Sequence, residues 1–119
     1  MSLKAIAQRM IRKMWGNDID PTARIHTSAS IDRTNPRGIH IAAGVEIAAD
    51  AIVLAHDLTR GKHCDTRIGA RTRIGERAIV MPGVTIGEDC IVAPAAVVTK
   101  DMPARSTAIG NPARIEARG

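Results

Sequence analysis

Aromatic residues are almost absent from this chain of 119 residues, which has no Phe, no Tyr and a single Trp at position 15. Globular cores usually take much of their bulk from aromatic side chains. A core built without them must be filled by small and β-branched residues, which favours a narrow and regular interior. The aromatic surface on which single-stranded nucleic acids stack is also missing, so we do not expect a nucleic acid as partner.

Cysteines and long apolar runs are scarce as well. Cys64 and Cys90 form no metal-type pair, and we interpret them as free thiols in a reducing compartment. No apolar run approaches the length of a transmembrane helix, and the N-terminus lacks the long apolar region of a signal peptide. We therefore expect a cytoplasmic protein with no bound metal.

The charge is unbalanced, with 17 basic against 12 acidic residues, a net charge of +5 and a pI of about 10.0. Such a balance suits a partner that carries negative charge. Since a nucleic acid is not expected, a phosphorylated small molecule is the better match.

A six-residue repeat of β-branched residues runs along most of the chain. A helix would repeat near 3.6 residues and a simple strand near 2, so the period of six indicates a different architecture. Twelve positions carry it, each Ile or Val: Ile19, Ile25, Ile31, Ile41, Ile47, Val53, Ile68, Ile74, Val80, Ile86, Val92 and Val98.

The repeat is interrupted twice. Ile31 and Ile41 are ten residues apart, four more than one repeat, and Val53 and Ile68 are fifteen apart, three more than two repeats. Each interruption predicts a loop that leaves the regular body. Loops on a rigid scaffold often carry function.

Small or medium residues occupy most positions two before each repeat residue, and glycine follows it at Gly69, Gly75 and Gly87. This pattern predicts a triangular coil in which each short strand forms one side and the branched residue points inward. Three sixes make one turn of 18 residues, and stacked turns pair their strands in parallel. Residues 19–98 supply about four turns.

The N-terminal segment differs in pattern. Residues 1–16 place apolar side chains at helical spacing, with most basic residues off that stripe, which predicts a short amphipathic α-helix. We interpret this helix as a cap on the coil or a contact with another subunit, with attachment to a membrane surface as the alternative. Residues 17–119 then form a second unit, the coil itself.

Several motifs carry a resemblance to a known family. Residues 99–103 read TKDMP and residues 110–114 read GNPAR, while TNPRGIHI at 34–41 precedes IVLAHDLTR at 52–60. With the repeat, these segments resemble the hexapeptide-repeat acetyltransferases, in the branch that acetylates sugars and polysaccharides. The resemblance implies an all-β fold, a left-handed parallel β-helix of about four to five coils. It also implies an acetyl-CoA-dependent O-acetyltransferase that works as a homotrimer on a small-molecule or glycan acceptor.

The resemblance assigns roles to individual residues. His56 matches the catalytic histidine, Thr99 and Lys100 match positions that contact CoA, and Arg114 matches a basic residue near the nucleotide phosphates. Chemistry agrees for His56, because a sugar hydroxyl needs a base that works near neutral pH. Asp57 and His63, in the same loop, are candidate substrate-binding residues.

The chain also departs from the family pattern. Residues 93–96 read APAA where the family often has GAGS, and the loop between Val53 and Ile68 is short, which predicts an open acceptor pocket. Alternatives stay open: a serine O-acetyltransferase, which DIDPTARI at 18–25 resembles, an amino-sugar N-acetyltransferase, and a non-catalytic β-helix scaffold. A metalloenzyme like the γ-class carbonic anhydrases is a further alternative, although it needs three converging histidines.

Overall fold

The computed structural model describes residues 2–3 and 18–118. The helix predicted for residues 1–16, and its boundary with the coil, lie outside the described residues apart from Ser2 and Leu3. Among the described residues, no helix is long and apolar enough to cross a membrane.

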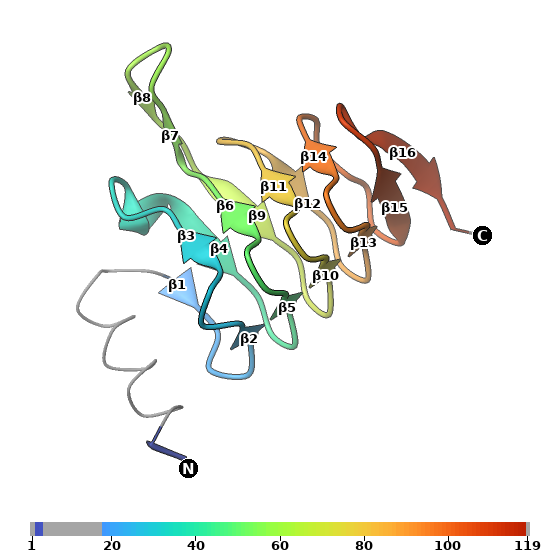
Figure 1. The fold of residues 1–119 in the computed structure, drawn as a ribbon, viewed down its shortest axis with the longest axis horizontal. Coiled ribbons are helices and arrows are strands. Elements are labelled where there is room, and N and C mark those ends of the chain that lie inside the picture. The colour runs from blue at the N-terminus through green and yellow to red at the C-terminus, as the bar shows by residue number, and fades with distance from the viewer. Residues whose placement is uncertain (1, 4–17, 119) are drawn as a thin grey trace.

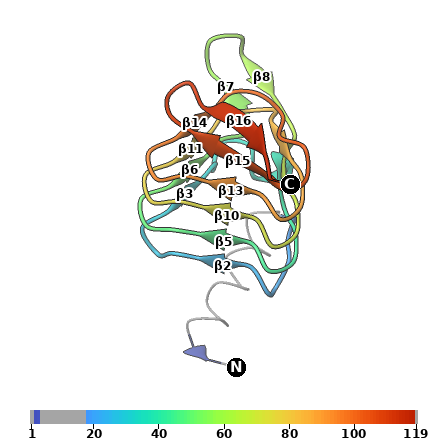
Figure 2. The same ribbon diagram turned by 90° about the vertical axis from the view of Figure 1, so that its right-hand side faces the viewer.

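Three parallel sheets form the sides of a triangular prism (Figure 1). Sheet A contains β1 (Asp18–Ile19), β4 (Ile39–Ile41), β9 (Thr66–Ile68) and β12 (Thr85–Ile86). Sheet B contains β2 (Arg24–Ile25), β5 (Glu46–Ile47), β10 (Arg73–Ile74), β13 (Ile91–Val92), β15 (Ser106–Ile109) and the antiparallel end strand β16 (Arg114–Ala117). Sheet C contains β3 (Ser30–Ile31), β6 (Ile52–Val53), β11 (Ile79–Val80) and β14 (Val97–Val98). The strands of sheet B lie one above another like rungs (Figure 2).

The predicted repeat and its inward direction are confirmed. All twelve repeat residues end a strand, and they pair in register down each side, as Ile41 does with Ile19 and Ile68. Nine of them are at most 3% exposed, and the three in the first coil are partly buried. Burying each such side chain contributes roughly 1.5–3 kcal/mol, so the column of branched residues stabilises the stack.

The coil continues beyond the last predicted repeat residue. Met102 pairs with Ile86 in sheet A, and Ala108 pairs with Val92 in sheet B. The two residues of each of these pairs are 16 positions apart instead of 18. The six-residue repeat therefore ends at Val98, although a fifth coil begins there.

The corners between sides follow a rule of their own. At corners without an insertion, the residue three positions before a buried repeat residue has a positive φ, as in Gly44 (70°), Arg71 (61°) and Ala95 (62°). The glycines that follow the repeat residue serve a different purpose. A Cβ on Gly69 would lie 2.4 Å from the backbone carbon of Gly87, so glycine there permits neighbouring coils to stack closely.

The two interruptions take different forms. The first inserts four residues between β3 and β4, around the 3-10 turn η1 (Pro36–Gly38), as predicted. For the second, the interpretation as two repeats plus three residues is wrong. Val53 ends a strand of sheet C, and Ile68 ends the strand of sheet A that forms the next side of the prism. The fifteen residues are therefore six for one side plus nine inserted.

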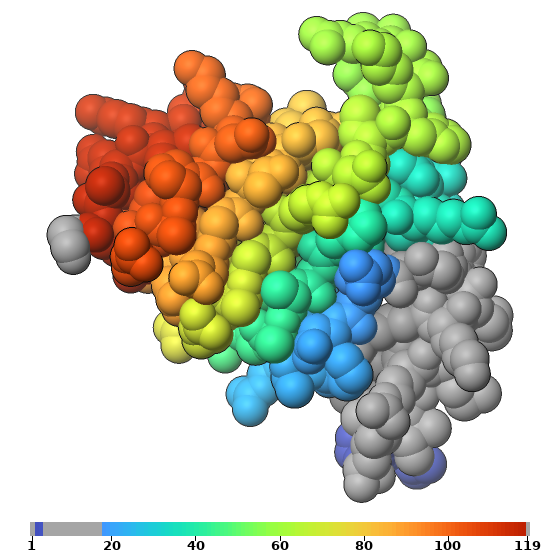
Figure 3. All heavy atoms as spheres, turned by 180° about the vertical axis from the view of Figure 1, so that it is seen from behind, coloured from blue at the N-terminus to red at the C-terminus, as the bar shows by residue number. Residues whose placement is uncertain are grey.

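Those nine residues build an antiparallel hairpin of β7 (His56–Asp57) and β8 (Lys62–His63). It extends well beyond the prism (Figures 1 and 3). The insertion is long enough to form two strands of its own.

Candidate active site

One edge of the prism gathers the segments that the sequence singled out. The chain passes from sheet C to sheet A at this edge, after β3, β6, β11 and β14. We call it the C–A edge. It carries both insertions and, two coils beyond the hairpin, Thr99 and Lys100. His56, Thr99 and Lys100 thus come from residues up to 44 positions apart and lie along a single edge.

The hairpin brings two histidines together. His56 and His63 are paired in register, and their rings meet edge to face with centroids 5.2 Å apart and planes at 82°. His56 is half-buried and His63 is exposed. The hairpin thus places the predicted base beside a predicted substrate-binding residue.

Asp57 points into its own turn. Its Oδ1 accepts hydrogen bonds from the backbone N–H groups of Thr59 (3.0 Å) and Arg60 (3.2 Å). Its Oδ2 lies 3.8 Å from Nε of Arg60. These contacts order the hairpin turn and leave Asp57 a weaker candidate for contact with the acceptor than His63.

Asp32 supplies a carboxylate at the base of the hairpin, and the sequence analysis missed it. Its Oδ2 accepts the N–H of Ala55 at 2.7 Å, one residue before His56. Burial alone would raise the pKa of Asp32, but hydrogen bonds from the N–H groups of Ala55, Asn35 and Thr34, together with nearby His56, lower that pKa below its ordinary value. The carboxylate is therefore ionised at neutral pH. Its place one residue after Ile31, where the first interruption begins, was the available signal.

The residues matched to CoA are exposed. Lys100 follows β14, and its neighbour Asp101 accepts the N–H of Thr85 at 2.8 Å, which fixes the corner. Arg114 begins β16 at the far end of the prism, where the N–H of Ala113 donates to the carbonyl of Val97. Within the described ranges neither Lys100 nor Arg114 has an ion-pair partner. Arg114 lies on a different corner of the molecule from Lys100.

His40 lies on the outer face of sheet A, as its position beside a repeat residue predicts. Nδ1 is 3.0 Å from Asp18 and Nε2 is 2.9 Å from Asp65. Hydrogen bonds to Asp18 and then to Asp65 raise the pKa of His40 above its ordinary value. The contacts tie the first coil to the strand that leaves the hairpin.

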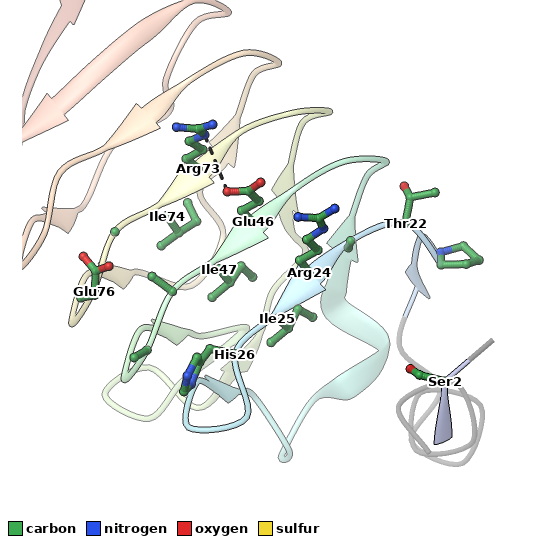
Figure 4. A pocket seen from close by; sticks show the side chains of 15 residues that line it. Ser2, Thr22, Arg24, Ile25, His26, Glu46, Ile47, Arg73, Ile74 and Glu76 are labelled. Atoms are coloured by element: carbon green, nitrogen blue, oxygen red, sulfur yellow. Dashed lines mark ion pairs between the residues drawn. The ribbon is translucent and has the colours of Figure 1, made fainter. Parts of the chain in front are cut away.

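Open grooves run along sheets A and B, and neither is lined by His56, Thr99 or Lys100. The groove on sheet B is crossed by charged side chains, including an ion pair of Arg73 with Glu46 (Figure 4). The C–A edge, in contrast, is a projecting ridge with a hairpin on it. Neither of these two grooves encloses His56.

The outer faces of the three sheets differ in chemistry. Paired outward positions read Asp18, His40, Arg67, Thr85 on sheet A and Arg24, Glu46, Arg73, Ile91, Thr107 on sheet B. On sheet C they read Ser30, Ile52, Ile79, Val97. Leu54 and Met81 extend this apolar face toward the C–A edge, and Met81 is 36% exposed.

Cys90 is buried, as its place in the repeat predicts, and its Sγ lies 3.1 Å from the carbonyl oxygen of Pro103. Across residues 2–3 and 18–118, no three His, Cys, Asp or Glu side chains are grouped to hold a metal ion.

Comparison with known proteins identifies the repeat. The bacterial transferase hexapeptide (six repeats) family matches residues 65–100. A putative acetyltransferase of Staphylococcus aureus (strain COL) is 48% identical over 48 residues, which cover 40% of this chain and 24% of that protein. Serine acetyltransferase 3, mitochondrial, of Arabidopsis thaliana is 31% identical over 119 residues, which cover 95% of this chain and 30% of that protein. The chain thus spans less than a third of either curated relative.

A solved structure confirms the architecture. A maltose O-acetyltransferase from Clostridium difficile 630 matches with a TM-score of 0.73, covering 99% of this chain and 78% of that one at 21% identity. The predicted fold, a left-handed parallel β-helix built from hexapeptide repeats, is confirmed. The acetyltransferases among the relatives support the prediction of an acyltransferase.

Proposed function

We propose that this protein is an acetyl-CoA-dependent O-acetyltransferase that acetylates a hydroxyl of a sugar or polysaccharide. One observation carries the proposal. A histidine on a projecting hairpin shares the C–A edge with Thr99 and Lys100, the residues that resemble a CoA-binding segment. The proposed base and the proposed CoA-binding residues therefore lie along one edge of the prism, and an extended cofactor is able to follow that edge.

The chemistry needs a base and a place for the donor. His56 takes the proton of the acceptor hydroxyl while its oxygen forms a bond to the acetyl carbon. The carbon–sulfur bond then breaks, and the proton passes from His56 to the CoA sulfur. His63, in ring contact with His56, lies where it would meet the acceptor.

Lys100 would bind the negatively charged end of CoA, and Arg114, on a different corner of its own chain, would contact that cofactor from a neighbouring subunit of the proposed assembly. An ammonium group offers a point charge and a guanidinium offers a planar fork, and both bind phosphates well. Thr99 lies beside Lys100 and offers a hydroxyl to the same segment. Neither cation is engaged by a carboxylate among the described residues.

The complete site requires a second copy of the chain. His56 stands on a ridge, and the apolar outer face of sheet C reaches that ridge through Leu54 and Met81. Packing this face against a neighbour would bury it and turn the ridge into a groove. We infer a homotrimer with three equivalent grooves, since closed rings are the common solution for identical subunits.

Serine is the second acceptor to consider. The observation in its favour is the Arabidopsis serine acetyltransferase, whose similarity extends over 95% of this chain. The same base and the same donor site would serve a serine hydroxyl, so only the acceptor contacts distinguish the two.

The test is a titration with acetyl-CoA followed by turnover assays on maltose and on L-serine. We expect saturable binding with one site per subunit. We expect His56→Ala to keep that binding and to lose a factor of about 10²–10⁴ in kcat. Full turnover by His56→Ala on the preferred acceptor would show that the histidine is not the base.

A further inference from the structure

Two side chains from the first insertion hold the base of the hairpin. The Oδ1 of Asp32 accepts the N–H groups of Thr34 (2.8 Å) and Asn35 (3.0 Å), which closes a tight turn. Its Oδ2 reaches across to the N–H of Ala55. A single carboxylate therefore orders its own loop and anchors the strand that carries His56.

Asn35 extends the contact to both strands of the hairpin. Its Nδ2 donates to the carbonyl oxygens of Ala55 (2.9 Å) and Cys64 (3.0 Å), the residues that precede His56 and follow His63. The space is fully used, because a Cβ on Gly38 would lie 2.1 Å from the carbonyl oxygen of Cys64 and 2.4 Å from Nδ2 of Asn35. Both histidines are thus held at fixed distances from the coil.

Asp32 differs from the other carboxylate near the histidines in what it contacts. Asp57 accepts hydrogen bonds from Thr59 and Arg60, within its own turn. Asp32 joins the hairpin to the coil, because it accepts the N–H of Ala55 beside His56.

We infer that Asp32 is a positioning residue for His56: through the N–H of Ala55 it holds the hairpin on the coil and so fixes where His56 meets the acceptor hydroxyl. The inference rests on the proposed function. The carboxylate comes from the preceding coil, 24 residues upstream of His56, and works through the backbone beside the histidine.

The decisive experiment compares Asp32→Asn with Asn35→Ala. The first replaces one of two accepting oxygens with an NH2 group, and the second removes the donor to Ala55 and Cys64. We expect each to lower kcat by 10-fold or more, with the KM for acetyl-CoA unchanged. The control is Asp20→Asn, which changes an aspartate that accepts the N–H of Thr22 in the first coil, away from the hairpin, and should leave kcat unchanged.

Proton NMR of the His56 ring provides a readout that needs no acceptor. The signals are assigned by their loss in His56→Ala, and at one fixed pH they should change position in Asp32→Asn and in Asn35→Ala but not in Asp20→Asn. A kcat and ring signals equal to wild type in Asp32→Asn would overturn the inference. If His56→Ala itself retained turnover, the proposed function would fail, whereas the NMR change would still report the anchoring of the hairpin by Asp32.

Discussion

Lys100 is the residue whose proposed role is tested most directly by substitution. It is exposed on the C–A edge without a carboxylate partner among the described residues. We expect Lys100→Ala to raise the KM for acetyl-CoA about 5- to 10-fold, the loss expected for one solvent-exposed charge-assisted contact, with a smaller change in kcat.

The matched control for Lys100 is Arg24→Ala. Arg24 is an exposed cation on the outer face of sheet B. This substitution removes one positive charge, as Lys100→Ala does, and should leave the KM for acetyl-CoA unchanged. Equal effects of the two variants would mean that the overall positive charge, and not a phosphate contact at Lys100, attracts the cofactor.

His40 makes the stability of the coil depend on pH. Hydrogen bonds to Asp18 and Asp65 raise its pKa above 6.5 in the folded protein. Folding therefore favours the protonated form of His40. This contribution to stability is complete below the unfolded pKa of about 6.5 and is lost as the pH rises through the folded pKa. We expect the urea midpoint to fall between about pH 6 and pH 9 by more in wild type than in His40→Gln.

His26 supplies the control for that experiment. It is exposed, and its Nδ1 lies 2.8 Å from the hydroxyl of Ser28. His26→Gln should keep the wild-type difference between the two pH values. If His40→Gln kept it as well, the contacts with Asp18 and Asp65 would contribute nothing measurable to stability.

Single residues of the site were predictable to different degrees. His56 breaks a regular repeat, so its exceptional position is visible in the sequence. Thr99 and Lys100 were found through a motif. Asp32 sits among polar loop residues, and its role depends on Ala55, 23 positions away, a contact that only the stacking of coils creates. The distances that matter for His56 are set between coils, where a sequence has no local signal.

At the scale of the element, glycine has two roles that the repeat pattern does not separate. Gly69 lies against the backbone of the next coil. Gly44 has a φ of 70°, and a Cβ added there would meet Arg71 alone. We expect Gly69→Ala to lower the free energy of unfolding by about 2–3 kcal/mol, because the added methyl group forces two coils apart. Gly44→Ala should cost about 1 kcal/mol, the strain of a left-handed corner.

Urea denaturation of the two glycine variants measures this difference. The chain itself gives a reason to expect the smaller value for Gly44, since Ala95 occupies the same repeat position at another corner with a φ of 62°. A Gly69→Ala variant no less stable than Gly44→Ala would mean that the coils separate easily, and the glycines after the repeat residues would then have no packing role.

The same scale explains the error at the second interruption. Fifteen residues divide into two sixes and three, or into one six and nine, and the sequence alone does not choose. The structure shows an insertion of nine residues, because the side of the prism after β6 in sheet C is β9 in sheet A. No side of the prism is skipped. The residues His56–Asp57 and Lys62–His63 then have room to pair as a hairpin.

At the scale of the whole molecule, the repeat predicted the prism but not which side faces a partner. The inward residues are Ile or Val on all three sheets, so they carry no information about the outside. The outward residues do. Sheets A and B place charged or polar groups at most of these positions, while sheet C places Ile52, Ile79 and Val97 in a row. This contrast identifies the side on which a second copy would bury the most apolar surface.

Ile79 and Ile91 form a matched pair for testing that assignment. Each is the first residue of a two-residue strand and points outward, Ile79 on sheet C and Ile91 on sheet B, where it is 37% exposed. We expect Ile79→Asp to convert the proposed trimer to monomers, because an interface would then have to bury an unpaired carboxylate. Ile91→Asp should keep the mass of the wild-type assembly. Light scattering after size-exclusion chromatography measures both masses.

The proposed groove at His56 includes a neighbouring subunit, so Ile79→Asp should also lose turnover while it remains folded by circular dichroism. A folded, fully active monomer would show that one chain suffices, and trimeric Ile79→Asp beside monomeric Ile91→Asp would move the interface to sheet B.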